Sequence, residues 1–199
     1  MWIFNFVDPH WSYEDLKAYI HQINSLENRA NKDRACFMSH LARHDANGTR
    51  TKLVELFNQI EQVSCAGKLL NNTDELKTAF NDNKRTYLRK FRFNLCPENT
   101  SVEGYVTEKC LESIMSGCIP VYWGNDSAEI EPEILNQNAI LRYTENNEAE
   151  LVAKVRELYS SETAYQAFIQ QKPFKENAAD VIWEKLQQLE KRLTDLARE

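Results

Sequence analysis

The stretch from Phe93 to Asn125 reads FNLCPENTSVEGYVTEKCLESIMSGCIPVYWGN, and its order of apolar and polar residues indicates the fold. The alternating run that ends at Cys96 predicts a strand, and the β-branched and aromatic run Ile119–Trp123 predicts a second one. Between them, helical spacing over Thr107–Ser116 is followed by a glycine, which is typical of the residue after a helix. A strand, a helix and a strand at this spacing predict a βαβ unit with parallel strands.

The rest of the chain continues this alternation of strands and helices. We expect further strands at Trp2–Val7, Ala35–Ser39, Val63–Cys65 and Ala139–Leu141. Helical patterns cover Tyr13–Ile23, Thr49–Ile60, Glu75–Asn81, Glu148–Tyr159, Thr163–Gln171 and Ala179–Arg198. The sequence shows no repeat of fixed period and no linker. It therefore predicts an α/β fold, a Rossmann-like parallel sheet with flanking helices and additional C-terminal helices.

Composition narrows the class of function. The chain has 199 residues and a formal charge of -6, a balance that argues against a nucleic-acid-binding surface. No apolar run approaches the roughly 18 residues that a membrane span needs, and the N-terminus does not resemble a signal peptide. The five cysteines show no CxxC spacing, so we expect reduced core thiols, no metal site and a cytoplasmic location.

The polar loop Pro97–Gly104 follows the strand that ends at Cys96, and this places it where open parallel sheets bind ligands. Lys109, in the first turn of the next helix, is a cation suited to a diphosphate. Glu108 beside it can accept hydrogen bonds from two ribose hydroxyls. Each residue alone has a plainer interpretation: Glu108 as an acid that favours the helix start, Lys109 as a surface lysine and Tyr105 as a packed aromatic.

Together, these residues resemble a specific signature, that of the α-1,3-fucosyltransferases, family 10 of the glycosyltransferases. The match consists of Pro97-Glu98-Asn99-Thr100, the run GYVTEK at 104–109 and the run GCIPVYWG at 117–124. Pro97 stands where the family has phenylalanine. The resemblance extends over about Asp33–Trp183, most of the chain.

The resemblance implies one half of a GT-B enzyme, in which the C-terminal domain binds GDP-fucose. In the family, a hydroxyl of a glycan acceptor attacks the fucose with inversion, and no metal or other cofactor is implied. By position, the donor-binding residues are Lys68, Asn99, Tyr105, Glu108 and Lys109. Lys68 falls where several members place a phosphate-binding cation. Glu98 is interpreted as a structural residue of the motif.

The main departure from the family is length. Residues 1–32 are too few for an acceptor domain, whereas 33–178 correspond to the donor domain and 179–199 to a C-terminal amphipathic helix. The catalytic base, which the acceptor domain supplies in the family, is therefore unassigned. The N-terminal candidates for a substitute are Asp8, His10, Glu14 and Asp15.

Two alternative functions stay open: a nucleotide-sugar binding module without transfer activity, and a transferase that uses another nucleotide sugar. The acceptor could be an N-acetyllactosamine-type glycan or a lipopolysaccharide, with peripheral contact to the inner membrane in a bacterium. A heptad-like seam predicts a homodimer, or docking on a separate acceptor-domain protein. The seam consists of Ile182, Leu186, Leu189, Leu193 and Leu196.

Overall fold

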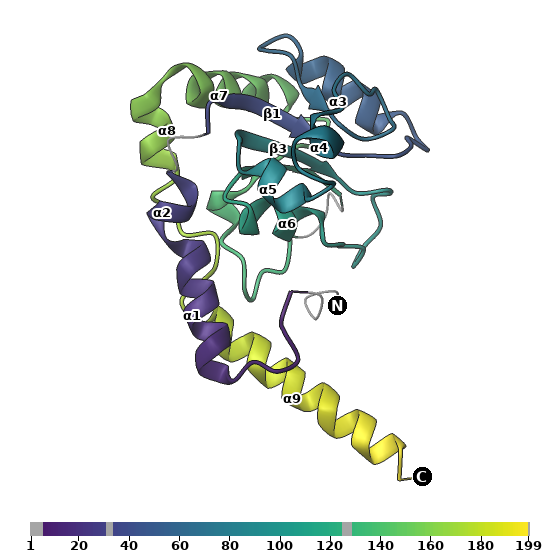
Figure 1. The fold of residues 1–199 in the computed structure, drawn as a ribbon, viewed down its shortest axis with the longest axis vertical. Coiled ribbons are helices and arrows are strands. Elements are labelled where there is room, and N and C mark those ends of the chain that lie inside the picture. Colours follow the sequence, from purple (N-terminus) through teal and green to yellow (C-terminus); the bar gives the residue numbers. More distant parts are fainter. Residues whose placement is uncertain (1–5, 31–33, 125–128, 199) are drawn as a thin grey trace.

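The computed structural model describes residues 6–30, 34–124 and 129–198, and its centre is a five-stranded sheet in the order β2-β1-β3-β4-β5. All four strand pairs are parallel. The strands are β1 (Cys36–His40), β2 (Ser64–Cys65), β3 (Phe91–Pro97), β4 (Ile119–Trp123) and β5 (Leu141–Arg142). The predicted Rossmann-like parallel sheet is thereby confirmed (Figure 1).

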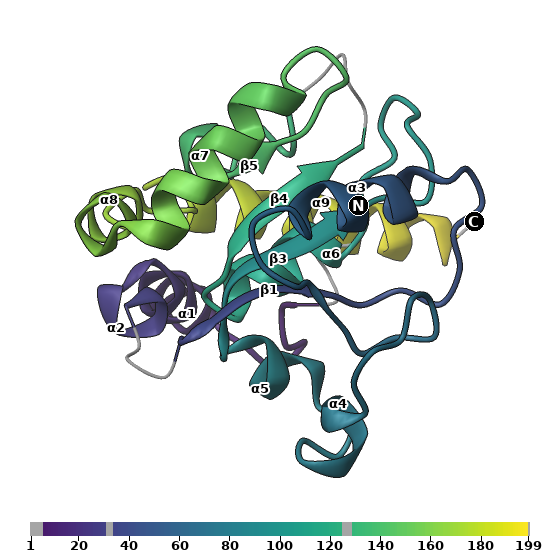
Figure 2. The same cartoon turned by 90° about the horizontal axis from the view of Figure 1, so that it is seen from above.

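Helices cover both faces of the sheet (Figure 2). Helices α3 (Thr49–Phe57) and α7 (Glu148–Ser160) lie over one face, and α5 (Lys84–Leu88) and α6 (Lys109–Met115) over the other. The remaining helices are α1 (Tyr13–Asn24), α2 (Leu26–Arg29), α4 (Glu75–Thr78), α8 (Glu162–Phe168) and α9 (Ala178–Leu196). Among the helices of the described ranges, none combines the length and the apolar character needed to cross a membrane.

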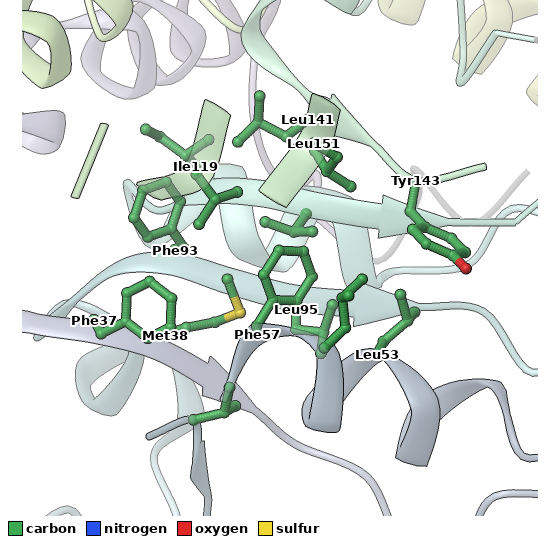
Figure 3. Close-up of a cluster of buried hydrophobic side chains, with 14 of the residues drawn as sticks. Phe37, Met38, Leu53, Phe57, Phe93, Leu95, Ile119, Leu141, Tyr143 and Leu151 are labelled. Carbon is green, nitrogen blue, oxygen red and sulfur yellow. The ribbon is translucent and has the colours of Figure 1, made fainter. Parts of the chain in front are cut away.

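Three apolar clusters hold these layers together, and the two largest lie on opposite faces of the sheet. In the first, Leu53 and Phe57 of α3 lie against Phe93 and Leu95 of β3 (Figure 3). In the second, on the opposite face, α1, α6 and α9 meet around side chains that include Leu16, Leu111 and Ile182, all of them fully buried. The N-terminal helix and the C-terminal helix are therefore part of the same packed structure as the sheet, although α9 continues beyond it (Figure 1).

Most predicted elements are present, with instructive differences. The strand predicted at Ala139–Leu141 is wrong, because 137–139 form a 3-10 turn and β5 follows at Leu141–Arg142. Helix α6 begins at Lys109 and not at Thr107, since the Thr107 N–H is bonded to the Glu98 side chain. Helix α2 was not predicted. Most of the strand predicted at Trp2–Val7 lies outside the described residues.

All five cysteines are free, as expected for core thiols, and four of them are buried. Burial raises the pKa of the Cys118 thiol to about 11. At neutral pH this thiol is protonated and poorly reactive, because the thiolate is the nucleophile. The cysteines therefore act as small apolar residues.

Gly117 lies at the amino-terminal edge of β4, where it adopts a φ of +77°. A Cβ at this position would collide with the side chain of Arg34 and with the carbonyl oxygen of Asn28. The Arg34 guanidinium is buried there and donates hydrogen bonds to the carbonyl oxygens of Ser116, Asn28 and Phe91. This glycine is thus required both by its backbone conformation and by the space that Arg34 occupies.

Candidate functional site

A pocket of about 260 Å³ opens at the carboxyl ends of β1 and β3. Its walls are formed by residues 40–44, by 94–97 at the end of β3, and by side chains from α3, α5 and α6. Two of these segments directly follow neighbouring parallel strands, which is the position at which open α/β sheets bind ligands. The motif loop predicted from the sequence lies on this rim.

Glu98 organises the motif loop. Its side chain is completely buried, and its backbone N–H donates to the Trp123 carbonyl oxygen at 2.8 Å. One carboxylate oxygen accepts from the Thr107 backbone N–H at 2.7 Å, and the other from the Thr107 hydroxyl at 2.6 Å and the Lys109 Nζ at 2.9 Å. A buried carboxylate needs such donors. Glu98 therefore has the structural role expected of it, and it fixes the cation at the pocket.

Lys109 is not an ordinary surface lysine, because hydrogen bonds hold its ammonium group in place. Its Nζ also donates to the Thr107 hydroxyl at 2.7 Å, and 23% of its side chain is exposed. Lys109 and its neighbour Glu108 both line the pocket. The side chain is anchored on one side by Glu98 and faces the pocket on the other, an arrangement that suits an anionic ligand group.

Arg50 is a site residue that the sequence analysis missed. It comes from the first turn of α3 and is 5% exposed. Its guanidinium donates to the His44 carbonyl oxygen at 2.6 Å and to the Asn99 side-chain oxygen. The Asn99 amide in turn donates to the Tyr105 hydroxyl at 3.2 Å. Arg50 thus joins two predicted residues, Asn99 and Tyr105, in one hydrogen-bonded chain at the pocket.

A signal for Arg50 was present in the sequence. It lies shortly after the strand that ends at His40, and β1 is the neighbour of β3 in the sheet. The loops that follow adjacent parallel strands meet at one edge. The helix at 49–60 was interpreted only through its apolar face, so Arg50 was given no role.

Lys68 is not brought together with the other four predicted residues. It is exposed in the loop after β2, and it is not among the residues that line the pocket. The adjacent backbone does support the pocket wall, because the Leu69 N–H donates to the Ala42 carbonyl oxygen at 3.0 Å. Arg50, and not Lys68, is therefore the cation that lines the pocket beside Asn99.

Polar side chains line the pocket from β1, β3 and α6, and those of β1 and β3 are buried. His40 is 2% exposed, with its Nδ1 3.0 Å from the Leu95 carbonyl oxygen, and Asn94 is 6% exposed. The His40 Nε2 and the Asn94 Oδ1 have no hydrogen-bond partner among the described residues. Burial lowers the pKa of His40 and raises the pKa of Glu112, which lines the same pocket.

None of the N-terminal candidates for a catalytic base lines this pocket. Asp15 belongs to the capping box of α1, in which it bonds with Ser12. The Asp8 side chain accepts from the His10 backbone N–H at 2.9 Å. Glu14 lies in the first turn of α1. These four residues are therefore located on the N-terminal segment, apart from the donor-binding motif.

Comparison with known proteins identifies the family of the chain. The family model described as glycosyltransferase family 10 (fucosyltransferase) C-term matches residues 27–196. The chain is 29% identical over 138 residues to alpha-(1,3)-fucosyltransferase FucT from Helicobacter pylori, covering 69% of this chain and 27% of that one. It is 32% identical over 124 residues to GDP-fucose protein O-fucosyltransferase 3 from Gallus gallus, covering 59% and 26%.

A crystal structure of an alpha1,3-fucosyltransferase with GDP superimposes with a TM-score of 0.61 and 26% identity. The match covers 79% of this chain and 45% of that structure. The chain thus spans about a quarter of the length of the curated relatives and less than half of the solved one. Since the family model covers most of the chain, including the motif loop, Arg50 and both sheet faces, the protein belongs to glycosyltransferase family 10, the fucosyltransferases.

Proposed function

We propose that this chain binds GDP-fucose in the pocket at the ends of β1 and β3 and provides the donor half of a fucosyl transfer. The observation that carries the proposal is the pair of anchored cations, Arg50 and Lys109, that line one pocket from two different helices. Each is held by buried or backbone acceptors on its protein side. Two preorganised cations match the charge of a diphosphate.

We assign the other groups of the donor to the side chains beside these two cations. In this proposal Glu108 accepts from the ribose hydroxyls, as a carboxylate can do for two adjacent donors. Asn99 and Tyr105 lie on the Arg50 side and contact the sugar and its phosphate. Lys68, which is exposed outside the pocket, has no part in binding.

The chemistry is a displacement at the anomeric carbon of fucose. A hydroxyl of the glycan acceptor attacks that carbon on the face opposite to GDP, the bond to the diphosphate oxygen breaks, and the configuration inverts. Negative charge develops on the departing diphosphate, and Arg50 and Lys109 stabilise it without needing to reorganise. Transfer that depends on no metal remains our expectation from the motif.

The acceptor site and the general base belong to the part of the relatives that this chain does not span. General-base assistance contributes about 10²- to 10⁴-fold in rate. We therefore expect the 199-residue chain alone to bind the donor and to transfer fucose poorly. The alternative of a binding module without transfer activity rests on the same incomplete coverage of the relatives.

Calorimetry and a transfer assay test this function. We expect GDP and GDP-fucose to bind with similar affinity, GDP-mannose more weakly and UDP-sugars weakest. Preference for another nucleotide sugar would identify a different transferase. A chain that binds GDP-fucose and yet gives no transfer to N-acetyllactosamine-type or lipopolysaccharide acceptors, even with an acceptor domain supplied, would be a binding module.

A second part of the proposal concerns the apolar seam of α9. Ile182 is buried, whereas Leu189, Leu193 and Leu196 are 38%, 58% and 65% exposed. With Trp11 and Trp183, the seam borders a groove of about 840 Å³. We propose that a second copy of the chain covers it. Charges of both signs flank the seam, with Glu190 and Asp195 beside Lys191 and Arg192, so opposite charges on two copies of the helix can face each other.

A further inference from the structure

The pocket contains hydrogen-bond acceptors that lack donors. The His40 Nε2 and the Asn94 Oδ1 are both buried and without a partner, although buried polar atoms are normally bonded. Glu112, one turn after Glu108 on α6, presents a carboxylate to the same pocket, and no hydrogen bond to that carboxylate is formed by the described residues. These three residues, here called the acceptor wall, come from β1, β3 and α6.

The protonation of His40 is fixed by its neighbour. Its Nδ1 lies 3.0 Å from the Leu95 carbonyl oxygen, and a carbonyl oxygen can only accept a hydrogen bond. The proton of the neutral imidazole is therefore on Nδ1, and Nε2 is a bare acceptor. The His40 Nε2 and the Asn94 Oδ1 consequently need a ligand that brings N–H or O–H groups, and the Glu112 carboxylate can accept from the same ligand.

The space beside the acceptor wall suits a flat ring. Leu41, Ala42 and Leu88 line the pocket and offer apolar contact. Glu108 and Glu112 are four residues apart, so they lie on one side of α6 with about 5–6 Å between their Cβ atoms. A nucleoside that places its ribose at Glu108 can thus place the edge of its base at Glu112.

We propose that the acceptor wall reads the guanine base of the donor, with Glu112 accepting from N1–H and the 2-amino group and with His40 and Asn94 completing the set. The inference rests on the proposed function. Guanine presents two adjacent donors on this edge, whereas adenine presents one donor beside an acceptor, and uracil a single N–H between two carbonyl groups. A wall made of acceptors therefore selects guanine.

Calorimetry with four nucleoside diphosphates tests the assignment: GDP, inosine diphosphate, xanthosine diphosphate and ADP. Inosine lacks the 2-amino group, so wild type should bind it about 10- to 100-fold more weakly than GDP. In Glu112→Gln, which keeps the shape, this difference should shrink to about 3-fold. The new amide can donate to the 2-carbonyl of xanthine, so preference should move toward xanthosine diphosphate. Glu55→Gln is the matched control, since Glu55 is exposed on α3 and outside the pocket.

The possible outcomes distinguish a failure of the guanine assignment from a failure of the proposed donor binding. Tight binding of GDP with an unchanged ratio of GDP to inosine diphosphate in Glu112→Gln would overturn the acceptor wall and leave the donor site standing. Equal binding of GDP and ADP by wild type would do the same. Binding of none of the four by folded wild type would overturn the proposed function and the inference together. Circular dichroism of each variant verifies its fold.

Discussion

The Nζ of Lys109 lies 2.9 Å from a carboxylate oxygen of Glu98, and that carboxylate is completely buried at the end of the central strand. The cation that we assign to the donor's diphosphate is therefore also the partner of a buried charge. Folding and donor binding share this one contact. Its removal should be visible in both measurements.

Lys109→Met should lower the free energy of unfolding by about 3 kcal/mol, because it leaves a buried carboxylate with fewer donors. It should also weaken GDP binding about 10- to 100-fold, the range for a charge-assisted hydrogen bond. Denaturant titration and calorimetry measure the two effects. In Lys109→Met/Glu98→Gln, stability should partly recover while GDP affinity stays low. Lys154→Met, at an exposed lysine of α7, should change neither. Full GDP affinity in a folded Lys109→Met would contradict its assignment.

Arg50→Lys should weaken GDP binding about 10-fold or more, although the charge is kept. A lysine cannot reproduce the fork that binds the His44 carbonyl and the Asn99 side chain together. Lys68→Met, which removes a whole charge from an exposed loop, should leave the affinity within about 2-fold. Calorimetry measures both affinities. If Lys68→Met weakened GDP binding more than Arg50→Lys did, the phosphate contact would belong to Lys68 and not to Arg50.

Glu108→Gln should reduce the ability of the protein to distinguish GDP from 2′-deoxy-GDP. Wild type should prefer GDP about 10-fold, since a hydrogen bond from a ribose hydroxyl to a carboxylate is lost with the deoxy compound. Glu108→Gln should show a smaller preference for GDP over 2′-deoxy-GDP, and calorimetry measures both affinities. Glu103→Gln, at an exposed position of the motif loop, serves as control. The same preference in both Glu108 forms would exclude Glu108 from the ribose.

His40 should make stability depend on pH. Burial holds the pKa of its imidazole below the ordinary 6.5, so the unfolded chain takes up a proton before the folded one does. This contribution to stability is present above about pH 6.5 and is lost as the pH falls toward the lowered pKa. Relative to His40→Asn, wild type should therefore lose stability between pH 7 and pH 5. Other titrating groups, Glu112 included, are common to both proteins. Denaturant titrations at each pH measure the free energy of unfolding of both proteins. If the two proteins showed the same dependence on pH, the pKa of His40 would not change on unfolding.

Leu189→Glu/Leu193→Glu should convert a dimer into a monomer in light scattering, because it places charges in the exposed seam. Thr163→Glu/Gln170→Glu changes the net charge by the same amount at exposed positions that do not border the groove, and it should stay dimeric. If wild type were monomeric at every accessible concentration, a second copy of the chain would not cover the seam. A dimer that survives both glutamates would move the interface elsewhere.

Local patterns were sufficient to predict the sheet, because strand alternation and helical spacing depend on nearby residues. Strand β4 has the predicted bounds, β3 ends one residue later than predicted, and β1 is shifted by one residue at both ends. Asn99, Glu108 and Lys109 come together at one pocket for the same reason, since they lie in one short stretch after β3.

The remaining site residues depend on contacts between distant segments. Arg50 becomes a pocket residue only when α3 packs beside the loop that carries Asn99, 49 residues later. Asn94 lies within a predicted strand and His40 directly after one, and they face one pocket only when β1 and β3 pair. Their polarity inside otherwise apolar runs was the one sequence signal available.

Arg34 fills the space next to Gly117, at the amino-terminal end of β4, and the pocket lies at the opposite ends of the strands. The family signature therefore has two parts with different roles. Residues of the range 98–109 organise or line the pocket, whereas Gly117 makes room for a buried guanidinium. An activity screen would score damage at either part alike. At Gly117, however, lost activity would report a shortage of folded protein, and the few molecules that do fold should still bind donor normally.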